Sequence, residues 1–233
     1  IGGLQKCSTI DFPGKVACVL FTQGCNFRCA FCHNGELVDP KRWGTPISEE
    51  EVFAFLEKRK NVLDAVVISG GEPTLQKDLA EWFRRIKALG LATKLDTNGT
   101  HPDVLQSLIQ ENLLDFVAMD IKNHLGEAAY SSIVGIPGTL SAVKRSIQIL
   151  MTNSIDYEFR TTLIQEMHRP EDMLTLAASL QGARQWTLQK FRPEKTLDPQ
   201  WEAFHPWSLD EIKQLQTTLS QRFSELNVRY LGY

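Results

Sequence analysis

The chain has 233 residues, 42% of them hydrophobic, and a formal net charge of -3. Domains commonly hold about 50–250 residues, so this length predicts one domain over residues 1–233 with a sizeable core. The small negative charge, without a block of Lys or Arg, argues against a nucleic-acid partner. No apolar stretch approaches the ~18 residues that span a bilayer, so we expect no membrane partner.

The first predicted strand covers residues 16–21 and leads into a loop that holds three cysteines. Val and Phe fit a pleated surface, and Gly24 ends the strand. Cys25, Cys29 and Cys32 follow with C-x3-C-x2-C spacing. Thiolates are soft ligands that suit iron–sulfur clusters, zinc and Cu(I). A [4Fe–4S] cluster normally takes four cysteines, so three would leave one iron free for another ligand.

Zinc, with His33 as fourth ligand, is the alternative interpretation of this loop. Structural zinc usually takes two pairs of ligands from separate segments. Cys32 and His33 are adjacent, which hinders both from reaching one ion, and the sequence has no second C-x2-C pair. The spacing therefore favours an iron–sulfur cluster.

The remaining cysteines indicate the compartment. Cys7 and Cys18 are isolated, and five cysteines in this pattern do not form a disulfide framework. A reducing environment follows, so we expect a cytoplasmic protein. Cys18 lies within the apolar strand and is expected in the core. No secretory signal is visible at the start.

The rest of the chain alternates predicted helices and strands. Ser48 and Ser208 each precede a Glu by three residues, which is the pattern of a capping box. The apolar periodicity predicts helices at 48–58, about 75–89, from 102, 141–151, 170–180 and from 208. Strands are predicted at 65–69, 91–95, 116–121, 157–164 and 186–191, with 228–231 as a closing strand or a packed tail.

Such apolar strands, each followed by a helix, are typical of a parallel sheet covered by helices. A barrel and an open doubly wound sheet are the alternatives. Polar motifs follow successive strands: the cysteine loop, Gly70–Pro73, Asp96–Gly99 and Asp120–Lys122. Parallel barrels place their active sites at this end of the strands, so the motifs favour a barrel.

These motifs together resemble the radical S-adenosylmethionine (SAM) superfamily. The cysteine spacing and the Gly-Gly-Glu-Pro sequence match it. The Asp-Thr-Asn-Gly and Asp-x-Lys sequences and Cys32-His33-Asn34 resemble the activases of glycyl radical enzymes. The resemblance implies a single radical SAM domain, an α/β fold with an incomplete (β/α)6 TIM-like barrel and helices outside. It also implies one [4Fe–4S] cluster on Cys25, Cys29 and Cys32, whose fourth iron binds the amino and carboxylate groups of SAM.

The resemblance also implies which residues bind SAM. Gly70 and Gly71 lack a Cβ and let the backbone approach a ligand, and Glu72 supplies a carboxylate for the SAM amine. An ordinary strand-to-helix turn is the alternative. Further SAM contacts are expected from Phe31, His33 and Asn34.

A second group of expected site residues follows later strands. Asp120 and Lys122 are implied near the ribose and carboxylate of SAM, with a salt bridge at the rim as the alternative. Arg160 is a charge within an apolar strand and needs a partner, either SAM or a structural Asp or Glu. The oxygens of Asp96, Thr97 and Asp120 could hold a monovalent cation.

The implied function is radical activation of a partner enzyme. The reduced cluster donates an electron to SAM, and cleavage gives methionine and a 5′-deoxyadenosyl radical that abstracts hydrogen from a glycine of the partner. Residues 8–15 and 191–193 resemble activating proteins of anaerobic ribonucleoside-triphosphate reductase. Residues 189–195 lack the His of pyruvate formate-lyase activases, which weighs against that partner. Flavodoxin or ferredoxin is the expected electron donor.

Three alternatives stay open at this point. The first is the activase of another glycyl radical enzyme. The second is a small-molecule radical SAM enzyme such as a 7-deazaguanine synthase, and the third is a zinc-stabilised binding module. The aromatic segment 201–207 is either a docking surface or a packed loop.

Overall fold

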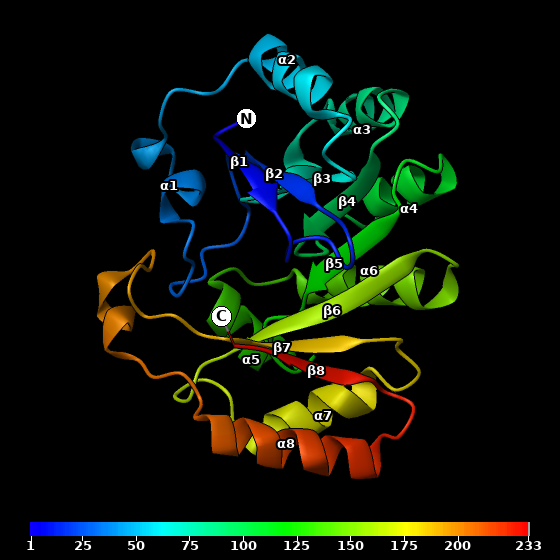
Figure 1. Ribbon diagram of the computed structural model, residues 1–233. Helices are drawn as coiled ribbons and strands as arrows, with labels where there is room; N and C mark the ends of the chain where they lie inside the picture. The colour runs from blue at the N-terminus through cyan, green and yellow to red at the C-terminus, as the bar shows by residue number, and fades with distance from the viewer. Residues whose placement is uncertain (233) are drawn as a thin grey trace. The chain divides into compact units, whose positions relative to one another are not determined.

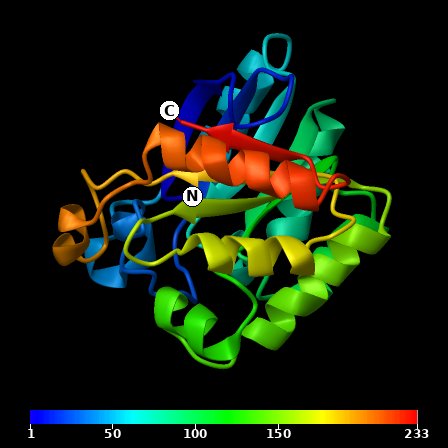
Figure 2. The same cartoon turned by 90° about the horizontal axis from the view of Figure 1, so that it is seen from below.

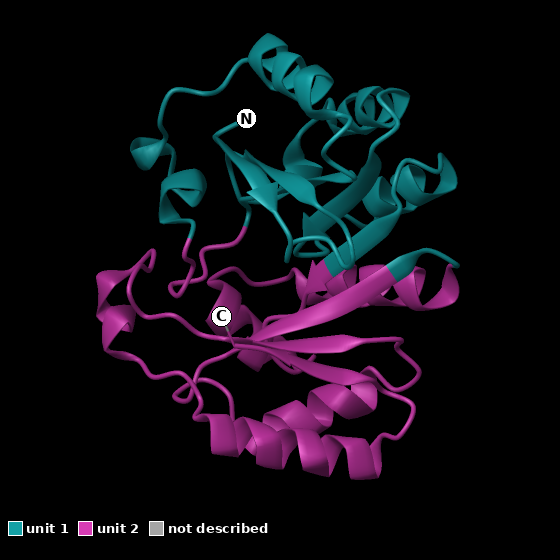
Figure 3. Ribbon diagram, in the orientation of Figure 1, with its two compact units in different colours: residues 1–26, 34–118, 154–156 teal, residues 27–33, 119–153, 157–233 magenta. Residues whose placement is uncertain are grey.

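The computed structural model describes residues 1–232 and divides the chain into two compact units (Figure 3). Unit 1 comprises residues 1–26, 34–118 and 154–156. Unit 2 comprises residues 27–33, 119–153 and 157 onward. The single domain expected over residues 1–233 stays a prediction.

Unit 1 contains parallel strands with one antiparallel strand at their edge (Figure 1). β1 (Gly3–Ser8) runs antiparallel to β2 (Ala17–Thr22). β2 pairs in parallel with β3 (Ala65–Gly70), and β3 with β4 (Ala92–Thr97). β1 was not predicted, because its residues are largely polar and exposed and give no apolar run.

The helices of unit 1 follow from local signals. Ser48 Oγ accepts a hydrogen bond from the Glu51 N–H and begins α2, as the sequence predicts. The helix predicted from about residue 75 begins only at Leu79, so its predicted start is wrong. Glu72 caps a separate 3-10 turn that ends at Leu75, and the Leu75 side chain is 39% exposed. The helical segments are α1 (Gly35–Val38), η1 (Pro40–Arg42), α2 (Glu49–Arg59), η2 (Pro73–Leu75), α3 (Leu79–Ala88) and α4 (Pro102–Gln110).

β2 and β3 are buried on both faces, which explains their continuous apolar runs. Phe12, from the β1–β2 connection, covers one face at the start of the strands. It packs there with side chains of β2 and β3, namely Ala17, Val19, Ala65 and Val67. Buried side chains of α2 and α3, namely Val52, Leu56, Leu79, Phe83 and Ile86, make up the helical layer.

Unit 2 contains a second set of parallel strands. β6 (Asp156–Leu163) pairs in parallel with β7 (Trp186–Lys190), and β7 with β8 (Val228–Leu231), so residues 228–231 form a strand and not a packed tail. α7 (Pro170–Ser179) and α8 (Leu209–Arg222) lie side by side along these strands (Figure 2). The unit also contains α6 (Leu140–Thr152), η3 (Pro199–Ala203) and an unpredicted helix, α5 (Glu127–Val134), which ends at the left-handed Gly135.

β5 (Phe116–Asp120) contributes residues to both units, with the division after Ala118. The strand order runs from β1 to β8 and, within the described residues, does not return to β1. The predicted α/β fold of parallel strands is therefore confirmed, and its sheet is open. None of the described helices is long and apolar enough to cross a bilayer.

Candidate active site

In unit 1, the loop after β2 is tied to the turn that follows β4. Asn98 Nδ2 donates to Asn26 Oδ1 at 2.9 Å and lies 3.9 Å from Cys25 Sγ. Asn26 Nδ2 in turn donates to Thr100 Oγ1 at 2.8 Å. Amide hydrogen bonds therefore fix the loop on which Cys25 stands. The sequence placed Asn98 in a motif but did not show this contact.

The two glycines at the end of β3 are required by the protein's own backbone. Gly70 has φ +120°, and a Cβ there would lie 2.5 Å from the Thr22 carbonyl oxygen. A Cβ on Gly71 would overlap the carbonyl oxygen of Gly24. The Glu72 N–H donates to that same Gly24 oxygen at 2.8 Å. The two glycines thus allow this turn to pack against the cysteine loop. This packing explains why glycine is needed at both positions, and it differs from the expected reason, which was close approach to a ligand.

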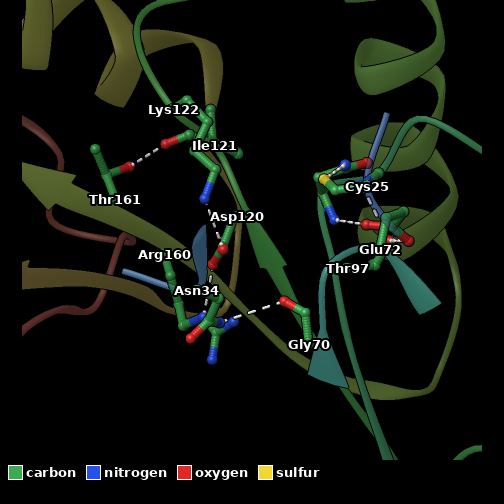
Figure 4. A network of polar contacts seen from close by, with 12 residues as sticks. Cys25, Asn34, Gly70, Glu72, Thr97, Asp120, Ile121, Lys122, Arg160 and Thr161 are labelled. Carbon is green, nitrogen blue, oxygen red and sulfur yellow. Dashed lines mark hydrogen bonds and ion pairs between the residues drawn. The ribbon is translucent and has the colours of Figure 1, made fainter. Parts of the chain in front are cut away.

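Glu72 is fully buried, and its carboxylate faces the end of β4 (Figure 4). Oε1 accepts from the Thr74 N–H at 3.1 Å, Thr74 Oγ1 at 2.5 Å and Thr97 Oγ1 at 2.7 Å. Oε2 accepts from the Asn98 N–H at 2.7 Å. Burial raises the pKa of Glu72, and the hydrogen bonds oppose this rise. The carboxylate expected to meet SAM therefore joins two turns of unit 1.

Asn34 lies in unit 1, whereas the adjacent His33 belongs to unit 2. Asn34 Nδ2 donates to the Gly70 carbonyl oxygen at 3.3 Å (Figure 4). Its own carbonyl oxygen accepts from the N–H groups of Leu37 and Val38 and begins α1. Asn34 thereby fixes the start of α1 beside the glycine turn.

Asp96 and Thr97 end β4, and neighbouring side chains of unit 1 engage both. Asp96 Oδ1 lies 2.9 Å from the Nζ of Lys94, whose side chain is 2% exposed. Thr97 Oγ1 donates to Glu72. Sequence analysis missed Lys94, although a charge within an apolar strand is the signal that identified Arg160.

In unit 2, Cys29 and Cys32 stand at the two ends of one tight turn. The Cys32 N–H donates to the Cys29 carbonyl oxygen at 3.0 Å. Between them, the ring centroid of Phe31 lies 5.9 Å from that of Trp201 and 6.0 Å from Lys122 Nζ. Phe31 is buried, so its ring already packs on protein groups.

The aromatic segment 201–207 packs within unit 2. Trp201 and Phe204 have ring centroids 4.5 Å apart, and Trp207 is buried. Pro206 forms a β-bridge with Ile164. These contacts support the packed loop over the docking surface.

His33 stacks on Phe191, with ring centroids 5.9 Å apart and planes inclined by 20°. Burial lowers the pKa of His33, although a hydrogen bond to the Arg192 backbone opposes this. Its buried Nε2 has no hydrogen-bond partner among the described residues. A buried polar atom without a partner is costly, so His33 fits a position beside a bound polar ligand.

Asp120 pairs with two cations of unit 2 (Figure 4). Its Oδ1 accepts from Arg160 Nε, and its Oδ2 from Lys122 Nζ, both at 2.8 Å. Burial opposes the charge of Asp120, but the two cations outweigh it and hold the pKa of Asp120 well below its usual range. Burial also opposes the Lys122 ammonium, but Asp120 and the thiols of Cys29 and Cys32 raise its pKa. Arg160 therefore has the structural Asp partner that the sequence left open.

The Asp120–Lys122 segment is fixed by residues that sequence analysis did not assign. His168 is buried, with Nδ1 accepting from the Ile164 N–H at 3.1 Å and Nε2 lying 2.8 Å from the Lys122 carbonyl oxygen. Thr161 Oγ1 donates to the Ile121 carbonyl oxygen at 2.8 Å. Nothing in the local sequence pattern signals the role of His168, since its partner is 46 residues away.

The expected cysteine ligands are distributed over both units, with Cys25 in unit 1 and Cys29 and Cys32 in unit 2. Among residues 1–232, no three His, Cys, Asp or Glu side chains gather as a metal-binding group. The donor chemistry of each unit nevertheless suits an anionic iron–thiolate cluster, because an amide lies beside Cys25 and the charge of the Lys122 ammonium interacts favourably with negative charge on Cys29 and Cys32. Unit 1 holds the other predicted residues Asn34, Gly70, Gly71, Glu72, Asp96 and Thr97, and unit 2 holds Phe31, His33, Asp120, Lys122 and Arg160.

Comparison with known proteins identifies the class of this fold and site. The sequence model of the radical SAM superfamily matches residues 19–177, which include every predicted site residue. The chain therefore belongs to the radical SAM superfamily, whose members use a [4Fe–4S] cluster and SAM. It is 33% identical to a Methanocaldococcus jannaschii protein provisionally named a glycyl-radical enzyme activating enzyme, over 100% of this chain and 96% of that one. It is thus an enzyme of the glycyl-radical activase family.

Two further relatives match about half of the chain. A pyruvate formate-lyase 1-activating enzyme of Escherichia coli K12 is 31% identical over 58% of this chain and 56% of its own. A pyruvate formate-lyase-activating enzyme of Listeria monocytogenes is 36% identical over 52% of each chain.

Solved structures support the fold. Streptococcus suis SuiB bound to SAM has a TM-score of 0.71 at 13% identity, over 92% of this chain and 49% of SuiB. A radical SAM methyltransferase from Sphaerobacter thermophilus has a TM-score of 0.69 at 19% identity, over 94% of this chain and 67% of its own.

Proposed function

We propose that this enzyme generates a glycyl radical in a partner protein, using a [4Fe–4S] cluster held by Cys25, Cys29 and Cys32. The observation that carries the proposal is the C-x3-C-x2-C loop within a chain that matches, over its whole length, a protein provisionally named a glycyl-radical enzyme activating enzyme. The bound cofactors supply reductive cleavage of SAM to methionine and a 5′-deoxyadenosyl radical, which removes a hydrogen atom from the partner's glycine.

Residues of unit 1 have mainly positioning roles in this proposal. Asn98 holds the loop of Cys25 and offers an N–H to its sulfur. Glu72 and Asn34 hold the turn at Gly70 and Gly71 in place, so that its backbone carbonyl oxygens can accept hydrogen bonds from the amino group of SAM.

Residues of unit 2 supply charge and an apolar wall. The Lys122 ammonium offsets the negative charge of the thiolates of Cys29 and Cys32. Arg160 and Lys122 are held by Asp120 and can also attract the carboxylate of SAM. His33 offers its buried Nε2 to SAM, and Phe31 shields the cluster from water.

We assign anaerobic ribonucleoside-triphosphate reductase as the partner. Residues 8–15 and 191–193 resemble its activating proteins, and residues 189–195 lack the His of pyruvate formate-lyase activases. Pyruvate formate-lyase is the second candidate, which the two activases matched over half of the chain favour. Flavodoxin or ferredoxin as electron donor and a cytosolic location complete the proposal.

The test uses anaerobic protein with a reconstituted cluster, SAM and a chemical reductant. It is incubated separately with anaerobic ribonucleotide reductase and pyruvate formate-lyase, and glycyl radical is counted by electron paramagnetic resonance. We expect the radical signal in the reductase and methionine in both mixtures. A signal only in pyruvate formate-lyase overturns the partner assignment.

Matched cysteine variants test the cluster assignment. Cys29→Ser should abolish both SAM cleavage and the cluster's visible absorption. Cys7→Ser changes an exposed cysteine outside the motif and should retain both. Wild-type SAM cleavage by Cys29→Ser, or zinc in place of iron in the purified protein, contradicts the proposal.

A further inference from the structure

Lys94 is a fully buried ammonium in β4 of unit 1. Its side chain is 2% exposed and lies on the same face of the strand as Ala92 and Asp96. Ala92 packs against the apolar cluster that Phe12 covers. A buried ammonium is strongly unfavourable unless its charge is paired and its N–H groups are hydrogen-bonded, so the contacts of Lys94 require an explanation.

The contacts of Lys94 are those that a small cation would make. Its Nζ lies 2.9 Å from Asp96 Oδ1 and donates to the Asp11 carbonyl oxygen at 2.5 Å. The ring centroid of Phe116 lies 5.7 Å away. Ser8 Oγ donates to the Asp11 carboxylate at 2.5 Å, which fixes the loop that presents the carbonyl. A carboxylate oxygen, a carbonyl oxygen and an aromatic ring all attract a positive charge.

The donors expected for a monovalent cation are engaged in other interactions. Asp96 Oδ1 lies 2.9 Å from the Lys94 ammonium, which pairs its charge without hydrogen-bond geometry. The Thr97 hydroxyl donates to Glu72 at 2.7 Å and accepts from the Gly99 N–H at 3.1 Å. In unit 2, Asp120 is paired with Lys122 and Arg160. The negative charge of each carboxylate in this set is therefore already paired with a cation of the protein.

We propose that the Lys94 ammonium is a built-in cation for Asp96 and takes the place of a monovalent metal ion there. The protein then requires neither Na⁺ nor K⁺ at this position. The inference concerns the protein without cluster or SAM, so it stands or fails separately from the proposed activity.

Thermal unfolding of the protein without cofactors tests the proposal. Wild type should unfold at the same temperature in 100 mM sodium, potassium or choline chloride. Lys94→Met leaves the Asp96 carboxylate buried without its cation, and its midpoint in choline chloride should fall by roughly 6–20 °C. Sodium or potassium should restore part of that loss. A specific rise of the wild-type midpoint with Na⁺ or K⁺, or identical Lys94→Met midpoints in all three salts, overturns the proposal.

A second variant covers the case in which Lys94→Met does not fold. Lys94→Met/Asp96→Asn removes both charges, so it should fold and unfold at one temperature in all three salts. If the double variant folds and Lys94→Met does not, Asp96 needs a cation, as proposed. If neither folds in any salt, the proposal is overturned.

Lys87→Met is the matched control, because Lys87 forms an ion pair with Asp115 at 2.9 Å with both side chains partly exposed. It should lower the midpoint by less than about 4 °C and show no cation effect. Crystals soaked in thallium(I) give the direct readout. Anomalous density beside Asp96 is expected in Lys94→Met and not in wild type, and density there in wild type overturns the proposal.

Discussion

Charged side chains near the strand ends are buried, as Glu72 is, or partly buried, as Asp120 is, and each has specific partners. Glu72 accepts four hydrogen bonds in unit 1, and Asp120 forms two ion pairs in unit 2. Removing one partner of a buried charge is destabilising, because the remaining charge has lost its compensation. Substitutions at these positions are therefore expected to affect folding as well as cofactor binding.

A substitution at Thr97 tests whether losing one partner of the buried Glu72 carboxylate destabilises the fold. Thr97→Val keeps the shape of the side chain but removes the hydroxyl that donates to Glu72 at 2.7 Å. A hydrogen bond to a charged group contributes about 1.5–3 kcal/mol, so the unfolding midpoint should fall by roughly 3–12 °C. Calorimetry of the protein without cofactors measures this fall of the unfolding midpoint. Thr97→Ser keeps the hydroxyl and should retain most of the stability, and equal midpoints for the two variants would contradict the prediction.

At the scale of elements, the turn after β3 depends on close backbone packing. Gly70 and Gly71 lie against the backbone at the end of β2, and each lacks a Cβ where one would collide. From the sequence motif, the two glycines were expected only to let the backbone approach a ligand. The structure adds a requirement that exists before any ligand binds.

Gly71→Ala tests the packing requirement. The new Cβ would overlap the Gly24 carbonyl oxygen, and overpacking of this kind costs roughly 1–3 kcal/mol or more. Gly44→Ala is the control, because a Cβ there meets no atom within 4 Å, and its effect should stay within about 1 kcal/mol. Urea denaturation without SAM measures both. Equal stability of the two variants would show that Gly71 is needed only for the ligand.

At the scale of the whole molecule, the free energy of unfolding should depend on pH through His168. Burial lowers its pKa below the ordinary value of about 6.5, so the unfolded chain binds the proton first as pH falls. The contribution of the neutral, buried His168 to the free energy of unfolding is complete above about pH 6.5. It is lost by up to about 1.4 kcal/mol per pH unit below that value.

The measurement compares wild type with His168→Gln. Urea denaturation at pH 7.5 and 5.5 should show a larger loss of stability for wild type, because the variant has no imidazole to protonate. Parallel pH profiles would mean that His168 is protonated in the folded state without cost. His33 also has a lowered pKa and is left unchanged in both proteins, so its contribution cancels.

The sequence by itself determined the alternation of strands and helices, the positions of the polar motifs and the family to which they belong. These features are local: apolar periodicity, capping residues and short motifs are complete within a few residues. The errors of the sequence-based prediction are also confined to short segments. Polar β1, short α5 and the 3-10 turn at Pro73–Leu75 give weak periodicity or have boundaries set by a single hydrogen bond.

Only the tertiary structure decided which partners the charged residues take. Lys94 meets the carbonyl of a residue 83 positions away, and Glu72 meets the backbone of Asn98 across 26 positions. Glu72 therefore faces a neighbouring turn, and Asp96 faces an ammonium. Sequence spacing cannot give these pairings, because they arise where folding brings distant strand ends together and each buried charge must find a partner.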